Sequence, residues 1–126
     1  MRDSFYFNMA IQVAARNLVI QRADLRAHAI GAVAIRADGT IVKARNGSDT
    51  LPNPAIHAEY RVMRKAGHGA VVYVARQRKD GRIGLAKPCS HCLCTLRNKG
   101  AARVYYTVAE HEFDCIQLTP ARRGHL

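Results

Sequence analysis

Pro88-Cys89-Ser90-His91-Cys92 and, earlier in the chain, His57-Ala58-Glu59 are the two most informative segments of the sequence. Cys89 and Cys92 stand three residues apart, so on a helix their thiols share one face and reach the same point. The leading proline is typical of the first turn of a helix, where the helix dipole favours thiolate. The spacing predicts a helix over residues 89–98 that presents two sulfur ligands at its beginning.

His57 and Glu59 open a second predicted helix, over residues 58–66. A catalytic zinc needs three protein ligands and an open fourth position for water, and His57 with the two thiols of Cys89 and Cys92 supplies that set. Glu59 lies two residues beyond the histidine and points in a different direction, which leaves it free to move protons. The sequence therefore predicts zinc as the cofactor, these three residues as its ligands, and Glu59 as the catalytic acid and base.

Other interpretations of the two thiols remain open at the level of sequence. A redox dithiol would need a βαβ context of its own and would give no role to His57. A purely structural zinc would need a fourth protein ligand, for which the chain offers Cys94, Cys115, His91 and His111. No second C-x-x-C or H-x-H pair frames these residues. We expect Cys94 and Cys115 to lie in the core as small apolar side chains.

Helical and β-rich segments alternate along the chain. The expected helices are 4–23, 58–66 and 89–98, and the expected strands are 28–36, 40–45, 70–76 and 103–108, with a further possible strand at 114–118. Ala37-Asp38-Gly39 predicts a hairpin between the first two strands, and 79–87 is predicted as a basic loop. The nearly continuous apolar run 70–76 is typical of a central strand covered on both faces. This order predicts an α/β protein, a three-layer α/β/α sandwich with a mixed central sheet.

The pattern H-x-E followed by P-C-x-x-C is the signature of zinc nucleobase deaminases, and the chain resembles the cytidine and deoxycytidylate deaminase superfamily from about residue 5 to 108. The resemblance implies the same fold and a glutamate that shuttles protons. It implies that Asn46, at the end of the second strand, binds base or sugar, and that backbone around Ala58 helps to hold the base. It also implies a homo-oligomer whose neighbouring subunits complete the pocket.

The implied reaction is hydrolytic. Zinc lowers the pKa of water, while Glu59 takes a proton from it, delivers that proton to the ring nitrogen as oxygen attacks C4, and later protonates the departing ammonia. A cytosine-type base becomes uracil. Adenine can be attacked at C6 by the same chemistry, so these residues define the reaction type and not the base.

Length and composition favour one compact domain. The chain has 126 residues, 48% of them hydrophobic, which predicts a single deaminase domain over residues 1–126. No signal pattern and no apolar run long enough for a membrane span are present in the sequence, so we expect a cytoplasmic protein that does not bind membranes. In a reducing compartment the four cysteines are expected to be metal ligands and core residues rather than disulfides.

The charge indicates an anionic partner. Twenty Lys+Arg against nine Asp+Glu give a net charge of +11. Basic residues cluster at 76–87 and on the predicted helix 58–66, where they either form a solvated face or guide a phosphorylated substrate or a single strand. Three functions follow: deamination of a nucleoside or nucleotide, deamination of single-stranded DNA or RNA including tRNA, or a zinc-stabilised nucleic-acid-binding module without catalysis.

Overall fold

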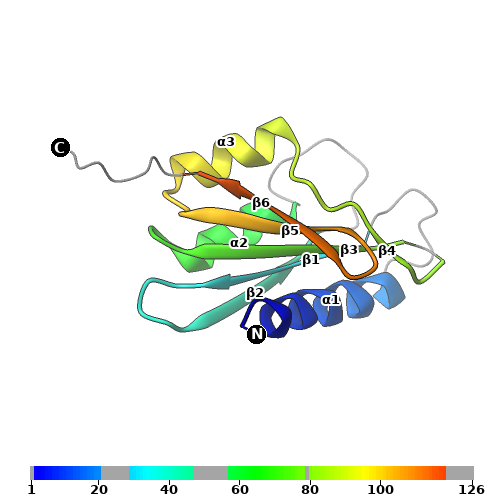
Figure 1. The fold of residues 1–126 in the computed structure, drawn as a ribbon. Helices are drawn as coiled ribbons and strands as arrows, with labels where there is room; N and C mark the ends of the chain where they lie inside the picture. Colours follow the sequence, from blue (N-terminus) through cyan, green and yellow to red (C-terminus); the bar gives the residue numbers. More distant parts are fainter. Residues whose placement is uncertain (1, 21–28, 47–56, 79, 119–126) are drawn as a thin grey trace.

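A computed structural model describes residues 2–20, 29–46, 57–78 and 80–118 (Figure 1). Three helices and six strands follow one another along the chain: α1 (Arg2–Ile20), β1 (Ala29–Ile35), β2 (Ile41–Arg45), α2 (Ala58–Ala66), β3 (Val71–Gln77), β4 (Ile83–Gly84), α3 (Ser90–Asn98), β5 (Arg103–Ala109) and β6 (Glu112–Gln117). No helix among these described residues is long and apolar enough to cross a membrane.

The strands form one mixed sheet in the order β2-β1-β3-β5-β6, with the short β4 paired to β3. β3 and β5 run parallel, and every other pair is antiparallel. A parallel neighbour requires a crossover connection, and α3 lies in the connection between β3 and β5. The predicted mixed central sheet is confirmed.

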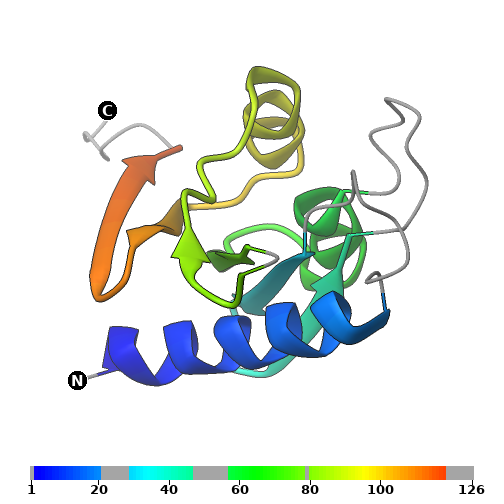
Figure 2. The same cartoon turned by 90° about the vertical axis from the view of Figure 1, so that its right-hand side faces the viewer.

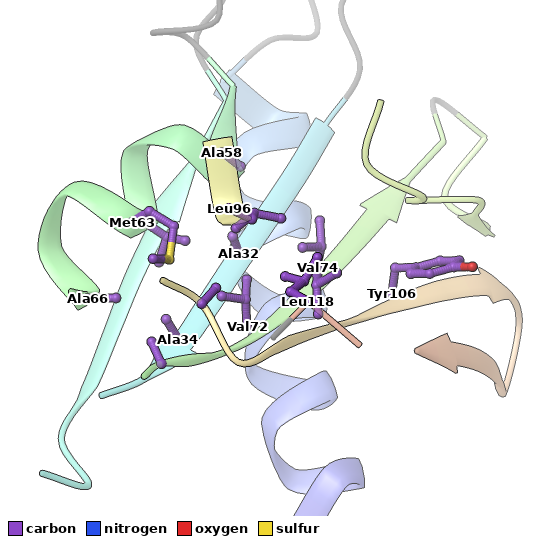
Figure 3. Close-up of a cluster of buried hydrophobic side chains, with 14 of the residues drawn as sticks. Ala32, Ala34, Ala58, Met63, Ala66, Val72, Val74, Leu96, Tyr106 and Leu118 are labelled. Atoms are coloured by element: carbon purple, nitrogen blue, oxygen red, sulfur yellow. The ribbon is translucent and has the colours of Figure 1, made fainter. Parts of the chain in front are cut away.

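The sheet is covered on both faces, by α1 on one side and by α2 and α3 on the other (Figure 2). Successive side chains of β1 and β3 alternate between the two layers, as the pleat requires. Val33 and Tyr73 pack with Phe7 of α1, whereas Ala32 and Val72 belong to the core under α2 and α3. Figure 3 shows this second core, in which Leu96 of α3 lies close to Ala58 of α2. The predicted three-layer α/β/α sandwich is therefore confirmed.

The sequence predicted most elements within a few residues and missed one short strand, β4. The bounds of α2 agree with the prediction, and the hairpin between β1 and β2 forms, with Gly39 at φ 91°. The predicted loop 79–87 contains β4, which pairs with β3 at Arg76 and Gln77. The possible strand 114–118 is a full antiparallel partner of β5 that begins earlier, at Glu112. Part of the predicted first helix, residues 21–23, lies outside the described residues.

Helix α1 touches the sheet at a glycine. A Cβ built on Gly31 of β1 would lie 2.5 Å from the carbonyl oxygen of Ala10 and 2.5 Å from the amide nitrogen of Ala14. Both alanines are completely buried. The backbone of the helix therefore packs directly on the backbone of the strand, and only glycine fits at this position.

We predict that Gly31→Ala destabilises the protein by about 1–3 kcal/mol, because the added methyl group must push helix backbone that cannot move independently. Chemical denaturation followed by circular dichroism measures this. Ser4→Thr, which adds one carbon at an exposed position of the same helix, is the control and is expected to change stability by less than about 0.5 kcal/mol. Equal unfolding midpoints for Gly31→Ala and the unmodified protein would contradict the close packing of α1.

Candidate metal centre

The sheet topology brings the N-termini of α2 and α3 to the same end of the molecule. β2 and β3 are both antiparallel to β1, so they run parallel to each other. α2 follows β2 and α3 follows β3 in the chain, with β4 intervening before α3. Both helices therefore begin at the end of the sheet where β2 and β3 have their carboxyl ends. In open α/β sheets, ligands bind at the carboxyl ends of the strands.

Three possible metal ligands meet there. His57 is the N-cap residue of α2 and Cys89 is the N-cap residue of α3, with Cys92 one turn further along α3. Nδ1 of His57 lies 3.0 Å from Sγ of Cys92, and ligand atoms of all three residues lie within 4.8 Å of one another. Ligands of a tetrahedral zinc with bonds of about 2.0–2.3 Å lie roughly 3.4–3.8 Å apart. One imidazole nitrogen and two thiols at this spacing fit zinc after small adjustments, with His57 and Cys92 moving slightly apart.

The surroundings favour the neutral form of the histidine. Burial, followed by the neighbouring charge of His91, holds the pKa of His57 below its usual value. A neutral imidazole is the form that coordinates metal. Burial and then the Glu59 carboxylate raise the pKa of the Cys92 thiol in the metal-free protein. A bound dication reverses this preference, so metal binding at Cys92 is coupled to proton release.

Glu59 lies beside this group as one of two buried polar or charged residues of the described chain, with 4% of its surface exposed. Burial raises the pKa of its carboxyl group to about 6, against hydrogen bonds from its own backbone and from Cys92 that favour the carboxylate. A carboxyl group that is desolvated in this way can both accept and return a proton near neutral pH. A nearby dication would shift the balance back toward the carboxylate.

Thr107 anchors the segment that carries Cys89. Its side chain is completely buried in β5 and donates a hydrogen bond to the carbonyl oxygen of Gly84, at 2.8 Å. Its backbone carbonyl accepts from the amide of Ala86, also at 2.8 Å. These bonds fix the chain just before the buried Pro88 and the N-cap cysteine. Sequence reasoning missed this residue, for which the only signal was one hydroxyl within an apolar strand.

The two predicted substrate-binding residues lie at the same end of the sheet. The backbone amide and the side-chain Oδ1 of Asn46 both bond to Ile30, at 3.2 Å and 2.9 Å, and so extend the pairing of β1 and β2 by one residue. Ala58 opens α2, and its side chain is completely buried in the core. The binding roles of Asn46 and of the backbone at Ala58 stay predictions.

The prediction that Cys94 and Cys115 lie in the core is wrong, because both are exposed. We call His57, Cys89 and Cys92 the metal group. Cys94 is two residues beyond Cys92, so on α3 it points away from the side that faces this group. Cys115 lies on the outermost strand, β6, with its neighbours Ile116 and Leu118 more buried. Among the described residues, the group of potential ligands contains His57, Cys89 and Cys92 and no fourth side chain. The geometry favours an open site over a closed structural one.

Comparison with known proteins agrees with this donor set. The family model of the cytidine and deoxycytidylate deaminase zinc-binding region matches residues 1–108. No curated protein sequence matches the chain. The fold is similar to RibD from Acinetobacter baumannii, form 1, with a TM-score of 0.62 and 23% identity over 84% of this chain and 28% of the RibD chain. The chain thus spans less than a third of the length of RibD.

Two structures of similar length share the fold. Cytidine deaminase from Mycobacterium leprae has a TM-score of 0.53 and 15% identity, over 86% of this chain and 91% of that one. Cytidine deaminase from Mycobacterium tuberculosis has a TM-score of 0.50 and 20% identity, over 79% and 81%. The matched family region includes all three residues of the metal group. The chain therefore belongs to the cytidine and deoxycytidylate deaminase family and contains its zinc-binding region.

Proposed function

We propose that this protein converts a cytosine-type base in a nucleoside or nucleotide to uracil, with release of ammonia. The observation that carries the proposal is the pairing of the His57, Cys89 and Cys92 group with one buried carboxyl group, Glu59. Two similar folds are cytidine deaminases, which supports this base over adenine. The proposal treats residues 1–126 as one deaminase domain that forms a homo-oligomer, as the sequence resemblance implies.

In this proposal Glu59 moves the protons of the reaction. His57, Cys89 and Cys92 would hold a zinc ion, which would lower the pKa of a water molecule at the site. Glu59 accepts a proton from the attacking water and delivers it to the ring nitrogen N3 while the new C4–O bond forms. It then moves the proton of the new C4 hydroxyl group to the amino group, the C4–N bond breaks as the C4=O carbonyl forms, and ammonia leaves. Asn46 and the backbone at Ala58 orient the base.

A second candidate is deamination of cytosine or adenine within single-stranded DNA or RNA, including tRNA. The net charge of +11 favours this candidate, because a mononucleotide carries few phosphates to match so many cations. The catalytic group is the same in both candidates, so they differ only in how the rest of the substrate is bound.

We predict that Glu59→Gln loses at least about a thousandfold in kcat while it keeps stoichiometric zinc, because the amide cannot accept and return protons. The measurement is ammonia release from zinc-loaded protein offered cytidine, deoxycytidine monophosphate, adenosine and cytosine-bearing single strands in parallel.

The matched control is Glu112→Gln, since this exposed glutamate on β6 lies outside the metal group and its substitution tests the loss of one carboxylate alone. The control variant is expected to keep its activity. Equal ammonia release by Glu59→Gln and the unmodified protein would remove Glu59 from the mechanism. If the unmodified, zinc-loaded protein releases no ammonia from any of the substrates, this result would favour the non-catalytic binding module.

We further predict that Cys92→Ser purifies with less than about a tenth of the zinc of the unmodified protein, because a neutral hydroxyl is a poor substitute for thiolate on this ion. Elemental analysis after dialysis against a weak chelator reads the zinc content. Cys94→Ser, an exposed cysteine of the same helix, is the control and is expected to keep one zinc per chain. The assignment of the ligands fails if Cys94→Ser loses zinc and Cys92→Ser keeps it.

A further inference from the structure

A basic groove lies at the outer edge of the sheet, and its lining contains none of His57, Cys89 and Cys92. It has a volume of about 710 Å³ and lies where β2 is flanked by α1 of one layer and α2 of the other. Six of the eight described residues that line it are cationic, and none of the eight is acidic. The cations come from three elements: Arg16, Lys43, Arg45, Arg61, Arg64 and Lys65.

Two of these cations are fixed by the backbone of the edge strand. Arg61 donates from Nη1 to the carbonyl oxygen of Arg45 at 3.2 Å, and Lys65 donates from Nζ to the carbonyl oxygen of Lys43 at 2.7 Å. Four residues along a helix advance about 6 Å, and two residues along a strand advance about 6.8 Å. The two hydrogen bonds therefore match in spacing and hold α2 alongside β2.

The bonds have a structural and an electrostatic consequence. They occupy carbonyl groups that face away from β1, so they protect the sheet edge from pairing with another strand. The acceptors in these two bonds are neutral carbonyl groups, so the bonds themselves neutralise neither cation. These two long side chains lose their conformational entropy when the protein folds. Less entropy is therefore lost when an anion binds in the groove.

The groove extends away from the predicted metal group along α2. Arg61 lies four residues and Lys65 eight residues beyond His57, which corresponds to roughly 6 Å and 12 Å along the helix axis. Cations spread over this length exceed what the phosphate of a single nucleotide can contact. A single strand with its base at the metal group would place successive phosphates along such a row.

We propose that this groove binds the phosphate backbone of a single-stranded polynucleotide. The inference rests on the function proposed above and adds a substrate class to it, since a strand held in the groove can present a cytosine to the same site. A single strand is favoured over a duplex because a base inside a duplex must first leave its stack before the chemistry can reach it. A free nucleoside reaches the site without using the groove, so the two proposals can fail independently.

The test is fluorescence anisotropy with a short labelled oligodeoxythymidylate, which offers the backbone without a reactive cytosine. Lys43→Gln/Arg64→Gln removes two groove cations and leaves the bonds made by Arg61 and Lys65 intact. The control, Arg36→Gln/Arg97→Gln, removes the same charge from exposed positions outside the groove. Circular dichroism and thermal unfolding check that both double variants fold.

We expect the groove variant to bind the strand roughly tenfold more weakly and its slope of log affinity against log salt to become shallower by about 1.4, at about 0.7 for each phosphate contact. The control is expected to bind like the unmodified protein, and cytidine monophosphate at equal phosphate concentration is expected not to compete. Equal losses in both variants, an unchanged salt slope, or competition by the mononucleotide would each overturn the inference. Ammonia release from cytidine by the unmodified protein is read separately, so a failed groove leaves the deaminase proposal standing.

Discussion

The structure depends on bringing two helix N-termini to one point. His57 caps α2 and Cys89 caps α3, and the Nδ1 of His57 lies 3.0 Å from the Sγ of Cys92. This is possible because β2 and β3 run in the same direction, so the helices that follow them begin at the same end of the sheet. Ala58 of α2 and Leu96 of α3 belong to the same buried hydrophobic cluster, which keeps the two helices adjacent. The metal group therefore depends on the directions of β2 and β3 and on the core packing between α2 and α3.

Burial gives the residues of the site their chemical character. The same low-dielectric surroundings lower the pKa of His57 and raise the pKa values of Cys92 and Glu59. Each shift disfavours charge in the metal-free protein, and a bound dication compensates for it. In the metal-free protein these groups therefore favour their neutral forms, and metal binding shifts Cys92 and Glu59 toward their charged forms. The groove cations Arg61, Arg64 and Lys65 lie on the side of α2 opposite its buried residues, so one helix separates the buried carboxyl group of Glu59 from a basic groove.

Much of this could be predicted from sequence because local spacing carries it. The C-x-x-C and H-x-E patterns fix which atoms share a helix turn, and the structure brings the three side chains named from them within 4.8 Å of one another. The exposure of Cys94 and Cys115 could not be predicted from residue type. Cys94 is exposed because it lies two positions beyond Cys92 on α3, and Cys115 is exposed because it lies on the edge strand β6. β4 and the bonds of Thr107 depend on contacts between distant segments, which no local pattern encodes. The groove was visible only as basic residues on one predicted helix, because its other walls come from α1 and β2.

The ligand set expected at this site is three protein residues from two helix N-termini, with the fourth position open. X-ray absorption spectroscopy at the zinc edge on the zinc-loaded protein distinguishes an open from a closed site, because sulfur and lighter ligands differ in distance and scattering. We expect two sulfur atoms at about 2.3 Å and two lighter atoms at about 2.0–2.1 Å, one of which exchanges with an added anion. Three or four sulfur atoms, or a lighter ligand set that no added anion alters, would instead indicate a closed structural site.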